Sequence, residues 1–329
     1  MKLPKLDMDR SWAYEDWNKY AKVVSVYNKV NKTIGDNKKQ IGAAIAKGAK
    51  VVAKSPLLKK FTVDKFIANL KVEKIGSNTY RIAKQYVFQS YLIVGRNKAL
   101  LIDTGLGIGS LLDTVREITD KPLMVVCTHG HFGCVGGAGE FDEVMLSKYD
   151  IKIAKRMYNT LHKTIAKYNK DHVVKEPNFV PIDKKYLKDE RIDLGGRKIH
   201  VKEVPSHTKG SLCFYDDKFA FTGDIMGPFG FHILPGAVPM NLYADNFNEL
   251  YNKFLRQKIY CSYLPKDLKR DSVAKAKTMV YFAAMGTNNY RDLIRFRHTD
   301  DWKQFMLYYG YKANRRDREN RWDAIKTRL

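Results

Sequence analysis

The stretch VVCTHGHFGCVGG, residues 125–137, joins an apolar run to a glycine-rich loop that opens with two histidines. The run before them predicts a buried strand, and His129 and His131 follow directly after its end. Glycines let a chain turn tightly, and imidazoles on a loop fixed by a strand are well placed to bind a metal ion. The pair alone is a weak indication, because two neighbouring loop histidines are more often simply solvated.

Three further apolar runs end in the same way. Asp103 closes the run LLIDTG, His207 lies in VPSHTKGS after another strand-like run, and Asp224 closes FTGD. Each polar residue follows an apolar segment and stands beside a glycine or a turn. Loops at the ends of separate strands can meet on one rim of a sheet sandwich. The pattern therefore predicts that these side chains converge with His129 and His131.

The remaining pattern predicts a mixed α/β protein. Short β-rich runs from residue 72 onward predict a meander, GIGSLLDTVREIT and residues 150–170 predict helices, and RIDLGGRKIHVKEVPS predicts a hairpin at Gly195 and Gly196. Strands followed by a helix and a strand, twice over, favour an α/β sandwich with mixed sheets.

Helices are expected toward both ends of the chain. Residues 245–260 are predicted as a helix with Asp245 at its N-cap, and the region from residue 270 to the end as mainly helical. The expected organisation has three parts: a basic helical extension over 1–65, a central domain over 66–268, and a helical basic extension over 269–329 packed on that domain.

Several motifs together resemble the metallo-β-lactamase superfamily. They are TYRIA…SYLIVGRNKALLIDTGLG, THGHFGCVGG, VPSHTKGSLCFY and FTGDIM, in the order and at the separations typical of that family. The resemblance covers about residues 72–265, and VPSHTKGSLCFY is more similar to the glyoxalase II-like branch than to the RNA-processing branches. It implies a four-layer αββα sandwich with mixed sheets and a metal-dependent hydrolase.

The resemblance also implies a ligand set. His129, His131 and His207 match the histidines of the family's first metal, and Asp224 matches the aspartate that bridges to a second one. Three imidazoles and a carboxylate form a shell that zinc accepts, although other divalent metals stay open. Asp224 and His207 are then expected to take part in catalysis, and Asp103 to orient a ligand or a loop.

The chain departs from the family at the second metal. Gly133 stands where the family has an aspartate, Cys134 where it has a histidine, and Tyr263 where a late histidine is expected. One zinc ion is therefore expected rather than two. Cys134 and His232 remain alternatives as additional ligands, against the simpler interpretation of a buried thiol and a loop histidine.

Composition restricts the class of protein. The chain has 329 residues, a hydrophobic share of 44% and a formal net charge of +24. No signal-peptide pattern and no apolar run of about 18 residues is visible, which favours a soluble, cytoplasmic protein. Without a secretory signal, its four cysteines are not expected to form disulfides. They include no C-x-x-C pair, so a zinc ribbon or finger is not indicated.

These observations leave two classes of function open. The first is hydrolysis of an ester, thioester or lactone by a metal-activated water, with a small anionic substrate. The alternative is a catalytically weak or inactive relative that binds nucleic acid or another anionic partner through its basic surface. Peripheral membrane contact through residues 38–60 is a further alternative. The sequence does not indicate an oligomeric state.

Overall fold

The computed structural model describes residues 70–310, apart from residues 85–86, 108, 166–174, 189, 228, 233–235, 265, 286–289, 292–294 and 300–305. The chain divides into the units Met1–Phe66 and Ile67–Leu329, and every described residue belongs to the second unit. The helices expected in residues 1–65, and with them the membrane-binding alternative, lie outside the described residues. Among the helices that are described, none is both long and apolar enough to cross a bilayer.

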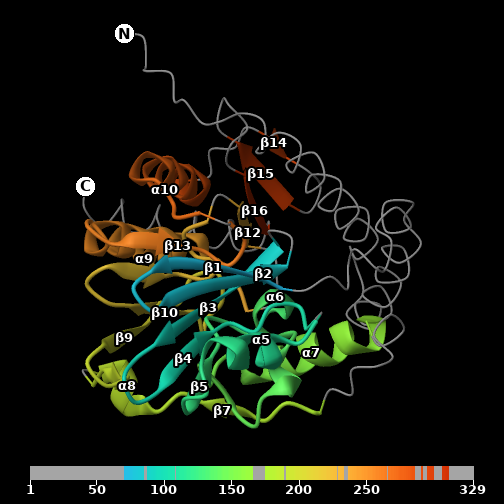
Figure 1. Ribbon diagram of the computed structural model, residues 1–329. Helices are drawn as coiled ribbons and strands as arrows, with labels where there is room; N and C mark the ends of the chain where they lie inside the picture. Colours follow the sequence, from blue (N-terminus) through green and yellow to red (C-terminus); the bar gives the residue numbers. More distant parts are fainter. Residues whose placement is uncertain are drawn as a thin grey trace. The chain divides into compact units, whose positions relative to one another are not determined.

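A seven-stranded sheet forms the first half of the sandwich (Figure 1). Its strands follow one another in sequence order, β1 to β7. The first four are antiparallel, as the predicted meander requires, and β4 to β7 run parallel. The strands are β1 Lys71–Gly76, β2 Thr79–Lys84, β3 Val87–Val94, β4 Ala99–Ile102, β5 Leu123–Val126, β6 Val144–Leu146 and β7 Phe179–Pro181.

A five-stranded sheet forms the second half, in the order β13-β11-β10-β9-β8. It is antiparallel except for the parallel pair β11 and β13. The predicted hairpin joins β8 to β9, and Gly195 and Gly196 both take a φ of 82°, a conformation that favours glycine. The strands are β8 Ile192–Asp193, β9 Lys198–Glu203, β10 Leu212–Tyr215, β11 Phe219–Phe221 and β13 Lys258–Tyr260.

Alternating side chains of the first sheet point into two separate cores. Ile93 and Leu100 pack between the two sheets, against Phe214 and Phe221 of the second sheet. Their neighbours Leu92 and Leu101 point to the opposite face and pack under helices. Those helices are α5 Leu111–Ile118, α6 Phe132–Val135 and α7 Ile151–Ile165.

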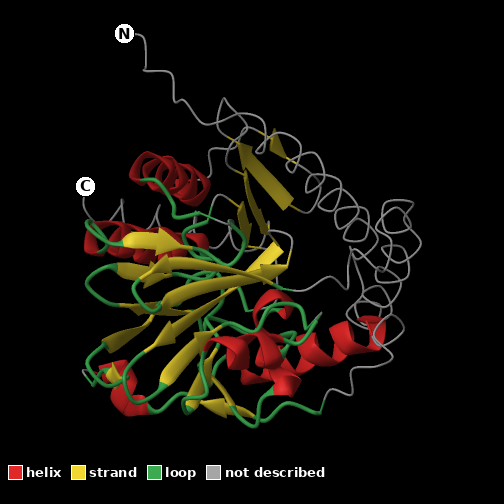
Figure 2. Cartoon of the chain, viewed as in Figure 1, coloured by secondary structure: helices red, strands yellow, loops and turns green. Residues whose placement is uncertain are grey.

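The second sheet is covered by helix α9, Met240–Lys253, on which α10, Arg270–Met285, packs (Figure 2). Helix α9 contacts the sheet through an ion pair of Glu249 with Lys202, and its C-cap residue Phe254 packs on Tyr215. The helix–sheet–sheet–helix sandwich and the mixed sheets expected from the sequence are confirmed. The smaller elements are the helix α8 Lys184–Lys188 and the 3₁₀ turn Ala138–Glu140.

Helix α9 begins earlier than predicted. Its N-cap is Pro239, so Asp245 lies inside the helix and the predicted cap is wrong. The buried residues of the helix explain the difference, because they already follow helical spacing from its first residue onward; they are Met240, Tyr243, Ala244, Phe247 and Leu250.

The helical region expected from residue 270 is present as α10, but the described chain beyond it is not helical. After α10 the chain forms three strands, β14 Tyr290–Arg291, β15 Arg295–Thr299 and β16 Met306–Gly310. They build a third sheet in which β16 pairs in parallel with β12, Phe229–His232. Aromatic residues such as those of MLYYG favour strands, but their partner is distant in sequence, and local patterns do not indicate it.

Candidate metal centre

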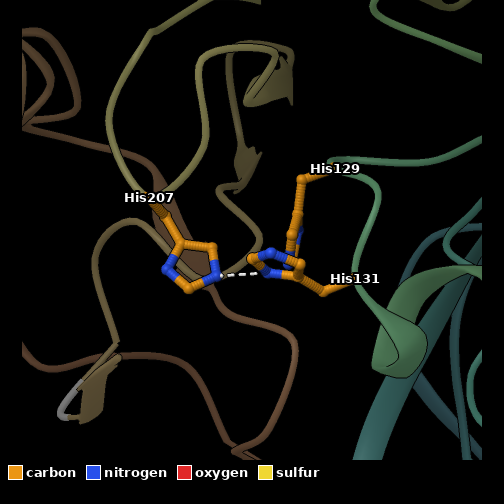
Figure 3. A group of neighbouring side chains, drawn as sticks. All are labelled: His129, His131 and His207. Carbon is orange, nitrogen blue, oxygen red and sulfur yellow. Dashed lines mark hydrogen bonds between the residues drawn. The ribbon is translucent and has the colours of Figure 1, made fainter. Parts of the chain in front are cut away.

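The structure brings together three histidines from loops that follow strands of different sheets (Figure 3). His129 and His131 follow β5, and His207 follows β9. The three rings are buried, with centroids 4.8 Å apart and planes nearly perpendicular to one another. Nδ1 of His131 lies 2.9 Å from Nε2 of His207. The ligand atoms offered by the three histidines all lie within 4.8 Å of one another, as atoms that share one ion do.

Asp224, after β11, completes the predicted set. Its Oδ2 lies 3.6 Å from Nε2 of His129 and 3.6 Å from Nε2 of His207. Its Oδ1 is buried without a hydrogen-bond partner among the described residues. A buried carboxylate oxygen without a partner is costly unless a cation or water satisfies it. Three imidazole nitrogens and this carboxylate therefore fit a zinc ion, whose usual ligands they are.

The electrostatics of the cluster favour a cation. Burial, and then the neighbouring His131, lower the pKa of His129 well below its ordinary value, so this imidazole is neutral and can act as a ligand. Burial raises the pKa of Asp224 to about 7, and the nearby Asp103 adds to the rise. A divalent cation between these groups would reverse the effect on Asp224 and hold it as a carboxylate.

Asp103 acts on the cluster through Thr128. Its carboxylate accepts hydrogen bonds from the Thr128 amide at 2.7 Å, from the Thr128 hydroxyl at 2.9 Å and from the Ser262 hydroxyl at 3.4 Å. The Thr128 hydroxyl oxygen lies 3.2 Å from Nδ1 of His129. Because that hydroxyl gives its proton to Asp103, it accepts from Nδ1–H, and Nε2 of His129 is left free to bind an ion. Burial raises the pKa of Asp103 to about 7.

The positions that depart from the family are filled by other groups. A β-carbon placed on Gly133 would overlap the ring of Phe88, so this ring occupies the space of the missing aspartate. Phe88 has a φ of 50°, unusual for a residue with a side chain, and packs edge-on against Phe132. Tyr263 is buried, and its hydroxyl lies where a β-carbon of Gly227 would be.

Of the two alternative ligands, Cys134 lies at the cluster. Its Sγ is 3.4 Å from Nδ1 of His129 and 3.7 Å from the Ser262 hydroxyl. His129, Cys134 and Asp224 also offer ligand atoms within 4.8 Å of one another. Burial raises the pKa of the Cys134 thiol well above its ordinary value. The backbone of His232 ends β12, and its side chain lies outside the described part of the structure.

Asp150 is a residue of the site that the sequence analysis missed. Its buried carboxylate accepts hydrogen bonds from the Gly130 amide at 2.9 Å, the Thr208 hydroxyl at 2.6 Å and the Gly210 amide at 3.1 Å. Asp150 thus ties the loop of His129 and His131 to the loop of His207. Its place directly before a helix suggests only an N-cap, so the sequence carries little signal for this role.

A family comparison agrees with the fold. The model of the metallo-beta-lactamase superfamily matches residues 89–265. This range contains all four predicted ligands and covers more than half of the chain.

Curated relatives and solved structures share only part of the chain. The acyl-coenzyme A thioesterase MBLAC2 of Homo sapiens is 29% identical over 161 residues, 41% of this chain and 57% of that protein. The metallo-beta-lactamase fold-containing protein ST1585 of Sulfurisphaera tokodaii is 26% identical, over 51% of this chain and 67% of its own length. The chain thus spans little more than half of the MBLAC2 relatives. The sec-alkylsulfatase Pisa1 of Pseudomonas sp. shares the fold, with a TM-score of 0.50 and 16% identity over 66% of this chain and 43% of that one.

Proposed function

Because the chain belongs to the metallo-β-lactamase superfamily, we propose that it is a metal-dependent hydrolase of thioesters with a single zinc ion. The geometry of three separate loops carries the proposal: His129, His131 and His207 offer ligand atoms within 4.8 Å of one another. Oδ2 of Asp224 lies 3.6 Å from Nε2 of His129 and of His207. Among the ester, thioester and lactone options, the names of the acyl-CoA thioesterase relatives favour the thioester.

Each residue of the cluster has a separate role in the proposed reaction. When bound, zinc supplies Lewis acidity toward a water molecule and toward the thioester carbonyl. His129, His131 and His207 hold the ion as neutral imidazoles, and Thr128 with Asp103 fixes which nitrogen of His129 faces it. Asp224 adds the one negative charge of the ligand set, and its Oδ1 has no competing donor among the described residues.

A single ion is proposed because the second set of ligands is replaced. Phe88 fills the space beside Gly133, and Tyr263 is a phenol packed on Gly227. The Cys134 thiol lies in a setting that disfavours the thiolate, which is the form that binds metal. An apolar ring and a buried thiol therefore stand where a second ion would need charged or imidazole ligands.

The test pairs metal content with turnover. Protein purified without chelators is expected to carry one zinc per chain by elemental analysis and to hydrolyse a short acyl-CoA. His131→Ala removes one ligand and should lower the zinc content well below one per chain and reduce thioester hydrolysis at least about a hundredfold. His200→Ala is the matched control, because His200 stacks on Tyr215 on the outer side of the second sheet.

Two results would count against the proposal. Two zinc ions per chain would disprove the single site and implicate Cys134 or His232 as further ligands. Turnover that survives both His131→Ala and zinc removal would show that the hydrolysis does not use this site. A chain that binds zinc but hydrolyses no thioester would favour the alternative, a weak or inactive relative that binds an anionic partner.

A further inference from the structure

A cluster of positive side chains lies beside the metal centre, at the start of helix α7. Lys148, Lys152 and Arg156 are exposed on this segment, and Lys209 is exposed on the loop of His207. We call these four residues, together with Tyr149, the basic rim. None of its four cations forms an ion pair with an acidic side chain in the part of the chain that the structure describes.

The segment that supplies the rim, residues 148–156, has the sequence KYDIKIAKR. Its only acidic residue, Asp150, is buried and turned toward the amides of Gly130 and Gly210. The carboxylate therefore does not neutralise the exposed cations through a direct contact. Glu203 also lies close to this segment, where it accepts a hydrogen bond from the Ser147 hydroxyl at 2.8 Å. The four cations still outnumber this one partly exposed acidic neighbour, and such an excess of positive charge attracts an anionic ligand.

Tyr149 gives the rim an aromatic surface. Its side chain is 41% exposed, one of only a few large apolar side chains in the described residues with such exposure. The ammonium group of Lys209 lies 4.5 Å from the ring centroid and that of Lys148 lies 5.0 Å from it. A planar base that stacks on this ring takes the place of an ammonium group over it, and the flexible lysine side chains can then turn to contact the phosphates.

The rim is joined to the metal centre by hydrogen bonds. Asp150, next to Tyr149, binds the amide of Gly130, which lies between His129 and His131. It also binds Thr208 and Gly210, the two neighbours of Lys209. Lys209 follows His207 by two residues, a backbone span of at most about 7 Å. A ligand on the rim is thus within reach of a reaction at the histidines.

We propose that the basic rim binds the phosphate-bearing carrier of the thioester substrate, a nucleotide such as coenzyme A, with its base against Tyr149. This inference rests on the proposed thioesterase function, but it assigns the carrier to residues outside the ligand set. Lys148 and Lys209 contact phosphates, and Lys152 and Arg156 add long-range attraction. The rim then determines affinity for the carrier, and the metal centre acts on the acyl bond.

The first experiment measures binding without catalysis. The full-length protein is titrated with desulfo-coenzyme A, and binding is measured by calorimetry. This ligand lacks the thiol that could bind zinc. The double variant Lys148→Ala/Lys209→Ala is expected to weaken binding by about tenfold or more, and Tyr149→Ala by about fivefold. Lys184→Ala/Lys188→Ala removes the same charge from helix α8 and should change the affinity less than twofold.

The second experiment measures hydrolysis of one acyl group on two carriers, coenzyme A and the uncharged N-acetylcysteamine. The Lys148→Ala/Lys209→Ala variant is expected to raise KM for the coenzyme A thioester about tenfold with kcat unchanged. Its KM for the N-acetylcysteamine thioester should stay within twofold of the wild-type value.

The outcomes separate the two proposals. If the wild type hydrolyses neither thioester, the proposed function fails. The desulfo-coenzyme A titration still tests whether the rim binds the carrier. If desulfo-coenzyme A does not bind, or if the rim variant and the α8 variant lose the same affinity, the rim is not a carrier site. The second result would show general attraction between a basic chain and a polyanion.

Discussion

Close packing against glycines sets the geometry of the metal centre at the scale of single residues. A β-carbon on Gly130 would lie 2.7 Å from the backbone oxygen of Asp150, and one on Gly210 would lie 2.6 Å from its carboxylate. Both distances are shorter than real β-carbons show, so the two glycines let both loops approach Asp150. Gly133 serves a different purpose, because it makes room for the Phe88 ring.

Replacing Asp150 with alanine leaves three buried donors without their acceptor: two amides and the Thr208 hydroxyl. The free energy of unfolding of the metal-free protein, measured in urea, should fall by about 3 kcal/mol. Zinc affinity should fall by about tenfold or more, because the loops carrying the ligands lose their shared anchor. Asp142→Ala, at an exposed carboxylate, should change stability by less than about 0.5 kcal/mol. Equal effects of the two variants would contradict the anchoring role.

Placing the family's aspartate at residue 133 should destabilise the chain. Gly133→Asp pushes a side chain into the Phe88 ring and buries a carboxylate, and should cost about 2–4 kcal/mol of stability. In a double-mutant cycle, Phe88→Ala makes room for the new side chain. The combined variant should therefore be more stable than the sum of the single effects by more than about 1 kcal/mol. Additive effects would mean that Phe88 does not occupy this space.

At the scale of elements, the site is built where strands of the two sheets end. β4 ends one residue before Asp103, and β5 ends shortly before Thr128 and His129. The Thr128 carbonyl accepts a hydrogen bond from the Leu212 amide at the start of β10, which ties the first sheet to the second. Residues on loops can hold a fixed geometry here because each loop is anchored at a strand end and again across the sandwich.

The third sheet leads to a prediction about the C-terminal region. In the described part of the chain, β12 pairs with β16 and with no other strand. A chain that ends at residue 289 lacks β16, so the amides of Phe229–His232 should exchange with solvent faster by about tenfold or more. Hydrogen exchange followed by mass spectrometry can measure this, with removal of Met1–Phe66 as the comparison truncation. Unchanged protection after the C-terminal truncation would show that β12 does not depend on this pairing.

At the scale of the whole molecule, the sequence predicts most of the sandwich and the members of the histidine cluster. The strand-end residues stand out because apolar runs, polar side chains and glycines alternate locally around His129, His207 and Asp224. Asp150 and Phe88 were missed because their roles depend on contacts with residues distant in sequence. The third sheet was missed for the same reason, since β16 finds its partner about 75 residues earlier in the chain.

Zinc binding should raise the stability of the whole folded domain. An ion that binds the folded chain and not the unfolded one should stabilise it by about 2.7 kcal/mol when free zinc is a hundred times the dissociation constant. For a domain of this size that corresponds to a rise in Tm of about 5–10 °C on adding zinc to chelator-treated protein.

The ligand variants give this zinc prediction its specificity. His207→Ala should abolish the rise in Tm, because two imidazoles and Asp224 hold zinc much less tightly than the full set. His200→Ala should keep the rise in Tm, since His200 lies within β9 and stacks on Tyr215 instead of joining the cluster. An equal rise in Tm in both variants would mean that zinc stabilises the chain by binding at another site, and would contradict zinc binding by the histidine cluster. A rise only where His207 is intact links the folding of the two loops to the metal that they are proposed to share.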